Sequence, residues 1–388
     1  MSPPIAILGG GPSGLTLAGI LEQLGHDYII YERSAESTPP RGGCLDIHRS
    51  SGQIALKAAG CFEEFKKYAR GGYATIHSVW DAHGTELFKF GEGRDSPEID
   101  RGQLRRVMLS SIPKEKVKWG CAVKNTYRRD GDGQVVVEFE NGEVAEGFGL
   151  VVGADGVRSK LRHLVTSTEP IYSGILFLTM FIHPSNPYHS ILEQLAGQGP
   201  MVICGREKKI WIQRQGDSHY RMDFGWKGPT DFPAADELDL ADEDAVREFL
   251  LREEYFGGHT SVVHDIIRNS TGPFRTWPLY YFPPDKLSWE TAPGVALIGD
   301  AAHVTTPFVG DGVNCAMRSA WILANKIGEL GITQEAVAAY EKEMFPYAQD
   351  VIRRSVLSGE MFFEWDSPRS LMKNMLSEDR VIRDEGDY

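Results

Sequence analysis

The sequence predicts an α/β fold: a Rossmann-like domain, an inserted and mostly antiparallel β-sheet domain, and a C-terminal helix. A complete β-α-β unit opens the chain at residues 4–32. Short apolar runs followed by glycine-rich loops appear again near residues 150 and 295, as expected for further strands of the same sheet. Between about 170 and 277, strand-like runs alternate with loops, which indicates a second sheet.

The opening unit begins with an apolar run at 4–8, which is typical of a buried parallel strand. Apolar residues at helical spacing follow in 12–25, and a second strand at 28–31 ends at Glu32. Further on we expect helices at 51–69 and 102–111, and strands within 75–90 and at 117–123, 125–129, 135–139 and 150–153.

The rest of the chain alternates between the two predicted domains. The inserted domain should hold strands at 175–182, 201–204, 210–213 and 220–226, and a helix at 243–252. A buried strand at 295–298, a helix at 314–330 and a long helix at 335–363 follow, and the charged tail 377–388 should be frayed. We therefore assign 1–169 with 278–331 to the first domain, 170–277 to the insert and 332–388 to a bridging helix and tail; within the first domain, 73–92 is a candidate to join the sheet of the insert.

Composition narrows the class of protein. The chain has 388 residues and a net charge of −13, which argues against a nucleic-acid partner because phosphate binding needs a basic surface. No apolar run reaches the ~18 residues that a membrane span needs, so we expect a soluble, cytoplasmic protein, by default a monomer. The five cysteines show no CxxC spacing, which predicts reduced thiols and no metal site.

The first loop has the pattern Gly9-x-Gly11-x-x-Gly14, between a strand and a helix. The first glycine permits the tight turn, the second lets a pyrophosphate approach the backbone, and the third lets helix and strand pack closely. Glu32 lies 18 residues after Gly14, near the spacing expected for a carboxylate that binds a ribose. This unit predicts a dinucleotide site and leaves NAD and FAD open.

Two later loops favour FAD. Residues 153–159 read GADGVRS and contain Asp155, and residues 299–303 read GDAAH and contain Asp300. Each follows a buried strand, at the sheet edge where such folds bind ligands. Asp300 can accept a hydrogen bond from a ribitol hydroxyl, and the free N–H groups of a helix beginning at 312–314 can meet the electron-rich edge of a flavin. A nicotinamide-only dehydrogenase would leave Asp300 and its loop unexplained.

Together these three segments resemble the class A flavoprotein monooxygenases, the group of para-hydroxybenzoate hydroxylase. The runs GGCLDIHR at 42–49, EIDR at 98–101 and PFVGDGVN at 307–314 are most similar to the tetracycline-inactivating monooxygenases. The resemblance implies an FAD-dependent enzyme that consumes NAD(P)H and hydroxylates an aromatic, phenolic or enolic, polyketide-like substrate through a C4a-hydroperoxyflavin, a class that includes tetracyclines. It implies no catalytic side chain and no metal, because the flavin performs the chemistry.

Motifs and resemblance together predict the contacts. FAD binding is assigned to Gly9, Gly11, Pro12, Ser13, Gly14, Glu32, Arg33, Asp46, Arg105, Asp155, Asp300, Pro307, Gly310, Gly312, Val313 and Asn314, and Arg41 is associated with NADPH. A small organic substrate should contact Thr179, Gln213, Asp223, Phe224, Pro307, Phe308 and Gly310.

The sequence departs from the family pattern at two positions. Asp311 stands where the family usually has glutamine, and Ser319 where it has aspartate. An extra carboxylate beside the flavin should disfavour an anionic reduced flavin. Two alternatives stay open: a flavin-dependent oxidoreductase that does not hydroxylate, and a non-catalytic binding protein on the same fold.

Overall fold

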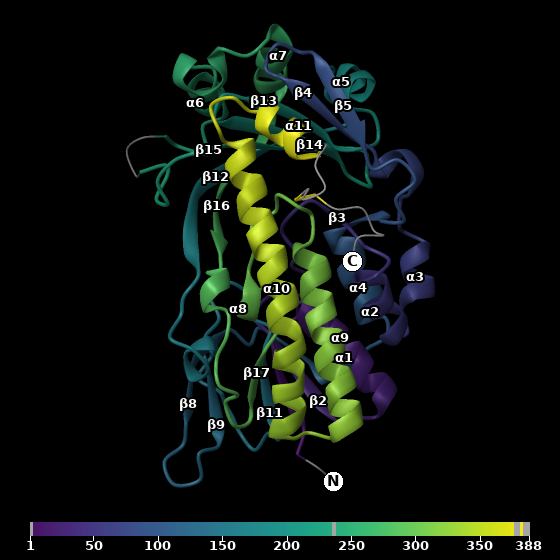
Figure 1. Ribbon diagram of the computed structural model, residues 1–388, viewed down its shortest axis with the longest axis vertical. Coiled ribbons are helices and arrows are strands. Elements are labelled where there is room, and N and C mark those ends of the chain that lie inside the picture. Colours follow the sequence, from purple (N-terminus) through teal and green to yellow (C-terminus); the bar gives the residue numbers. More distant parts are fainter. Residues whose placement is uncertain (1–2, 235–237, 376–380, 383–388) are drawn as a thin grey trace.

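The computed structural model describes residues 3–234, 238–375 and 381–382. The molecule is elongated, with a parallel sheet at one end of the long axis and a larger sheet at the other (Figure 1). Helix α10, Gln334–Phe362, runs along this axis from one sheet to the other (Figure 1). Most of the tail that we expect to be frayed lies outside the described residues.

The first sheet has five strands in the order β17-β11-β1-β2-β7, and all four pairings are parallel. Its strands are β1 Ile5–Leu8, β2 Tyr28–Glu32, β7 Val117–Trp119, β11 Leu150–Gly153 and β17 Val295–Leu297. Because β1, β11 and β17 are neighbours and parallel, the three loops that follow them meet at one sheet edge. The chain returns to this sheet after the insert, as the sequence predicts.

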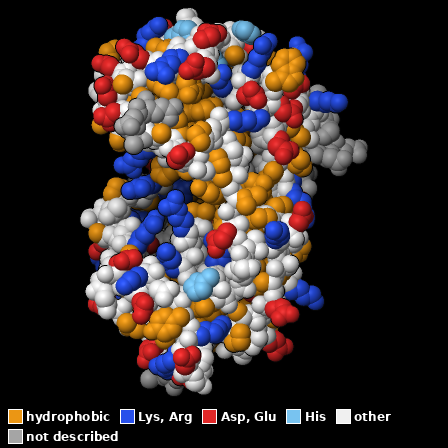
Figure 2. All heavy atoms as spheres, turned by 90° about the vertical axis from the view of Figure 1, so that its left-hand side faces the viewer, with side chains coloured by type: hydrophobic (Ala, Val, Ile, Leu, Met, Phe, Trp, Pro, Cys, Tyr) orange, Lys and Arg blue, Asp and Glu red, His pale blue; other side chains and the backbone are white. Residues whose placement is uncertain are grey.

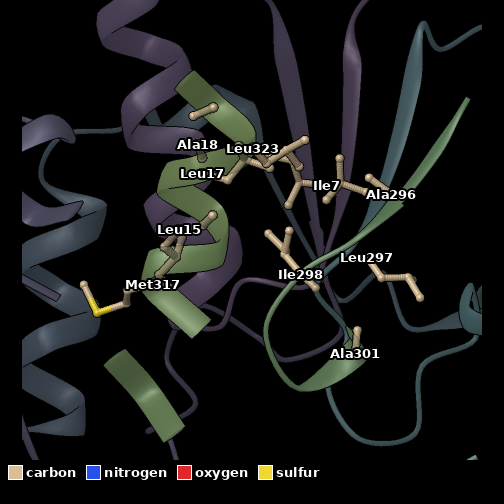
Figure 3. Packing of buried hydrophobic residues seen from close by; sticks show 14 of the residues in the cluster. Ile7, Leu15, Leu17, Ala18, Ala296, Leu297, Ile298, Ala301, Met317 and Leu323 are labelled. Atoms are coloured by element: carbon tan, nitrogen blue, oxygen red, sulfur yellow. The ribbon is translucent and has the colours of Figure 1, made fainter. Parts of the chain in front are cut away.

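Helices α1, Pro12–Leu24, and α9, Gly312–Leu330, lie against each other beside this sheet. Figure 3 shows Leu15, Leu17 and Ala18 of α1 close to Met317 and Leu323 of α9. All five side chains are buried. Burying a leucine contributes about 1.5–3 kcal/mol, so this contact fixes where both helices begin.

The second sheet has seven strands in the order β16-β12-β15-β14-β13-β4-β5. Its strands are β4 His77–Asp81, β5 Glu86–Phe90, β12 Ile171–Ile182, β13 Met201–Gly205, β14 Lys208–Arg214, β15 Tyr220–Lys227 and β16 Thr271–Tyr281. The pairing of β13 with β4 is parallel, and the other pairings are antiparallel. The segment 73–92 therefore lies in the inserted sheet.

The two faces of this sheet have different coverings. One face packs on helices α6, Glu243–Leu250, and α7, Ser261–Asn269. The other, which we call the cleft face, lies against Phe308 and the C-terminal end of α10. A substrate bound between the sheet and the first domain would meet the cleft face.

Shorter elements complete the fold. The expected helix at 51–69 is two helices, α2 Gly52–Ala58 and α3 Phe62–Lys66, because Gly60 adopts φ +72° between them. The other helices and strands are β3 Cys44–Asp46, β6 Glu98–Asp100, α4 Arg101–Leu109, β8 Val123–Arg128, β9 Val135–Phe139, β10 Val144–Ala145, α5 His189–Ala196, α8 Asp300–His303 and α11 Arg369–Met375. Single turns lie at Gly72–Thr75, Lys114–Lys116, Arg162–Leu164, Glu253–Gly257 and Pro284–Lys286. Within the described ranges, no helix has both the length and the hydropathy needed to cross a membrane.

Candidate active site

The glycine loop after β1 has the geometry of a dinucleotide cradle. A Cβ on Gly9 would lie 2.3 Å from the Ala154 carbonyl oxygen, and one on Gly14 would lie 2.0 Å from the Gly9 carbonyl oxygen. Both positions therefore exclude side chains. A Cβ on Gly11 would meet no atom within 4 Å, so this face of the loop is open at the start of α1. Pro12 and Ser13 form the first turn of that helix, where a pyrophosphate would be bound.

Glu32 is held at the end of β2. Its carboxylate accepts hydrogen bonds from the backbone N–H of Gly10, at 2.7 Å, and of Ser34, at 2.9 Å. The carboxylate is thus fixed beside the glycine loop, and its contact with a ribose stays a prediction. Arg33 and Arg41 are both exposed, on the stretch between β2 and β3.

Arg162 joins the other two loops, and sequence reasoning missed it. Its guanidinium is buried and donates to the carbonyl oxygens of Ala301, at 2.9 Å, and Val157, at 2.8 Å. It therefore ties the 153–159 loop to the 299–303 loop. Asp155 turns into its own loop, where one oxygen accepts from the Lys160 N–H at 2.7 Å. The only sequence signal for Arg162 was a basic residue shortly after GADGVRS.

Asp300 and Arg101 are close enough for each charge to affect the pKa of the other group. Solvent reaches Asp300, yet burial by the surrounding protein raises the pKa of its carboxyl, and the charges of Arg101 and Arg162 oppose that rise. Arg101 Nε is buried and has no hydrogen-bond partner among the described residues. Figure 2 shows Lys and Arg side chains gathered around a hollow between the two halves of the molecule. A buried cation with an unused donor fits an anionic ligand such as a pyrophosphate.

Arg105 lies one turn further along α4. One terminal nitrogen donates to the Thr38 carbonyl at 2.6 Å, and the guanidinium lies over the Trp119 ring at 4.9 Å. The other terminal nitrogen, Nη2, is buried and lacks a partner within the described part of the chain. The predicted pyrophosphate contact of Arg105 stays a prediction, and the structure leaves a donor for it.

The loop 307–314 is fastened to the segment after β3. The Asn314 side chain accepts from the His48 N–H at 2.8 Å and donates to the Asp46 carbonyl at 2.9 Å. Gly310 has φ +75°, and a Cβ there would lie 3.2 Å from Asp46 Oδ2. In this loop Pro307 is exposed and Phe308 is buried, while Gly312 and Val313 open α9. Asp46, Gly310 and Asn314, which were predicted from separate motifs, therefore lie next to one another.

Asp311 has ionic partners that the sequence did not reveal. His48 lies between two carboxylates, with Nε2 2.8 Å from Asp46 and Nδ1 3.0 Å from Asp311. Arg354 of α10 binds the second oxygen of Asp311 at 2.9 Å. Burial opposes a charge on His48, but its hydrogen bonds to Asp311 and Asp46 outweigh burial and raise its pKa to about 10. Asp311 therefore forms ion pairs with His48 and Arg354, and the expected effect of its carboxylate on the reduced flavin stays a prediction.

The second departure from the family, Ser319, is also accounted for. Its hydroxyl accepts from the Gly299 N–H at 3.1 Å and donates to the Ala316 carbonyl at 2.9 Å. The serine thus links α9 to the loop that contains Asp300.

Three of the predicted substrate residues lie on the cleft face. Thr179 donates to Asp223 and accepts from Trp277 Nε1 at 2.9 Å. Arg221 binds both oxygens of Asp223, at 3.0 and 2.9 Å. Gln213 lies further along the face and donates to Glu98 at 2.9 Å. Phe308 covers the face from the 307–314 loop, with its ring centroid 6.1 Å from that of Phe177.

Phe224 does not lie on the cleft face, and its assignment to the substrate is corrected. Successive side chains of a strand point to opposite faces, so Phe224 points away from its neighbour Asp223. It is fully buried against the helical side, with its ring centroid 4.9 Å from that of Phe256. It belongs to the core beneath α6 and α7.

Comparison with known proteins identifies the class. A family model described as an FAD binding domain matches residues 3–355. The curated protein 3-amino-4-hydroxybenzoate 2-monooxygenase PtnB3 of Streptomyces platensis is 27% identical over 383 residues, covering 96% of this chain and 91% of its own. The chain belongs to this FAD-binding family, that of the class A flavoprotein monooxygenases. It is an FAD-dependent monooxygenase.

Two solved structures share the fold. HpxO of Klebsiella pneumoniae, complexed with FAD and uric acid, has a TM-score of 0.76 and 22% identity, covering 97% of this chain and 92% of its own. The tetracycline destructase Tet(51) has a TM-score of 0.70 and 20% identity, covering 98% and 97%. The predicted fold class, family and FAD cofactor are confirmed.

Proposed function

We propose that this enzyme uses NAD(P)H and O2 to hydroxylate an aromatic, phenolic or enolic compound between the 307–314 loop and the cleft face. The observation that carries the proposal is the placement of Thr179, Asp223 and Gln213 on the sheet face opposite that loop. Aromatic rings surround these polar groups, which suits a flat substrate with a few oxygen substituents.

When bound, FAD would supply the redox chemistry that links oxidation of the pyridine nucleotide by O2 to insertion of one oxygen atom into the substrate. The side chains and backbone of the protein hold the cofactor and substrate in place and exclude water. Arg101 and Arg105 have N–H donors that no described residue accepts and that can bind the pyrophosphate, and the glycine loop lets the pyrophosphate approach the backbone. Phe308, Phe177 and Phe363 are buried together and would exclude water from the reacting carbon.

The proposed substrate class includes tetracyclines. The fold is similar to that of Tet(51), whereas PtnB3 is named for a small aromatic acid. The cleft face offers carboxylate, amide and hydroxyl groups, which can bind the phenol and enol oxygens of either compound.

The test is NADPH turnover by the FAD-loaded enzyme under 18O2 with 3-amino-4-hydroxybenzoate, a tetracycline and simple phenolic polyketides. We expect NADPH oxidation above the basal rate and one labelled oxygen in the product of at least one compound. A non-hydroxylating oxidoreductase would convert the consumed NADPH into hydrogen peroxide without labelled product. A non-catalytic binding protein would not oxidise NADPH at all.

A further inference from the structure

Lys209 is a buried lysine on the cleft face. It lies on β14 two residues before Trp211, so the alternation of the strand puts both side chains on the same face. Only 1% of Lys209 is exposed. Its ammonium nitrogen lies 3.2 Å from the ring centre of Phe362, 5.0 Å from that of Trp211 and 5.2 Å from that of Phe308.

The amine of Lys209 has no anionic partner in the part of the chain that the structure describes. Among the residues that the structure describes, none accepts a hydrogen bond from Lys209 or forms an ion pair with it. Arg221 on the same face is different, because Asp223 binds it with two hydrogen bonds. Three titratable groups face Lys209 from neighbouring strands: Cys204, His77 and Asp81, and the carboxylate of Asp81 accepts from the N–H groups of His83 and Thr85. Burial lowers the pKa of Lys209 to about 7.

Packing alone does not account for a lysine here. Aromatic faces attract an ammonium, yet they replace only part of its hydration, and no described residue accepts a hydrogen bond from its three N–H donors. A methionine would fill similar space without the cost of burying a charge. The lysine is therefore suited to a partner that arrives from outside the chain.

We propose that Lys209 selects substrates that carry an anionic oxygen, a carboxylate or an ionised hydroxyl, on a planar ring. The oxygen accepts from the ammonium, and the ring lies against Trp211 and Phe308. Because Phe308 belongs to the 307–314 loop, this anchor holds the ring beside the cofactor. The inference rests on the proposed function, whose substrate site it shares.

The test compares acids with their neutral isosteres on the FAD-loaded protein. The probes are 3-amino-4-hydroxybenzoate with its carboxamide and 2-naphthoate with 2-naphthamide, titrated by calorimetry and by the change in flavin absorbance. The variants are Lys209→Met, Lys209→Gln and Lys209→Arg. The matched control is Lys208→Met, on the same strand with its side chain toward His259 on the opposite face.

We expect at least one acid to bind about 10- to 150-fold more tightly than its amide, because one charge-assisted hydrogen bond changes affinity by about that factor. In Lys209→Met and Lys209→Gln this preference should vanish while amide affinity is unchanged. Lys209→Arg and Lys208→Met should keep it. The Tm of Lys209→Met should equal or exceed that of the wild type.

The proposal is overturned if no acid binds more tightly than its amide, or if no acid binds at all. It is also overturned if Lys209→Met still binds the acid more tightly than the amide. A failure of the proposed function looks different: the acid preference would depend on Lys209, but no bound acid would gain a labelled oxygen. Conversely, the enzyme could form labelled product while its preference for acids over amides is the same with and without Lys209. That outcome would contradict the role of Lys209 and support the proposed hydroxylation.

Discussion

Gly11 and Gly14 stand three residues apart in one loop and meet different requirements. The missing side chain of Gly14 lets α1 approach the Gly9 carbonyl, which is a matter of folding. Gly11 faces open space at the helix start, so its missing side chain matters to whatever binds there. Substitution by alanine can separate the two roles.

We expect Gly14→Ala to lower the free energy of unfolding of the flavin-free protein by about 1–3 kcal/mol, because its Cβ overlaps backbone. Gly11→Ala should change that value by less than about 1 kcal/mol, since its φ of −79° suits alanine. It should weaken FAD binding by about 5- to 150-fold. Urea unfolding and flavin titration measure the two quantities. Equal effects of both variants on stability would contradict the separation.

His48 makes stability depend on pH. Its folded pKa, about 10, is above its ordinary value of 6.5, so its pairing stabilises the fold fully below about pH 6.5. The stabilisation is lost as the pH rises through about 10. We expect the loss of unfolding free energy in His48→Gln to be larger at pH 6 than at pH 10, measured by urea denaturation. A loss that is the same at both pH values would mean that His48 is uncharged in the folded protein.

At the scale of elements, Asn314 fastens the first turn of α9 to the segment after β3. It is fully buried, and both the oxygen and the nitrogen of its side-chain amide form hydrogen bonds with backbone groups. We expect Asn314→Ala to cost about 2–6 kcal/mol, because a backbone N–H and a carbonyl lose their partner at about 1–3 kcal/mol each. FAD affinity should fall as well.

The control for Asn314 is Glu329→Ala on the same helix. Glu329 is exposed and pairs only with Lys326 among the described residues, so its removal should cost about 0–1 kcal/mol. Denaturant midpoints of the two variants test this difference. Similar midpoints would show that α9 is held by its apolar contacts alone.

The sequence predicts contacts between residues that are near one another along the chain, and it does not predict contacts between distant ones. The loop of Gly9, Gly11 and Gly14 was predictable because its geometry is local. Alternation along β15 indicates that Asp223 and Phe224 face opposite ways, but which face meets the cofactor depends on α6 and α7, which lie later in the chain. The partner of Asp311 is Arg354, 43 residues away, and no local pattern indicates that contact.

At the scale of the whole molecule, α10 belongs to both halves. Its residues Met344 and Val351 pack in the core of the first domain, and Phe362 packs on the cleft face. The two halves should therefore unfold together.

We expect far-UV circular dichroism and tryptophan fluorescence to report one coincident urea transition. FAD at 100 times its Kd should raise the free energy of unfolding by about 2.7 kcal/mol. Riboflavin, which lacks the pyrophosphate and adenosine, should raise it less. Two transitions, only one of which responds to FAD, would show that α10 does not couple the halves.

The parallel pairing of β4 with β13 limits how this enzyme can be re-engineered. An excised fragment of residues 170–277 would expose the edge of β13, and an unpaired edge strand invites aggregation. A chimaera that borrows its specificity from a relative must therefore import two separate stretches of that relative, including its counterpart of the hairpin at 77–90. A graft of the contiguous insert alone would join a foreign strand to a native hairpin in the same sheet.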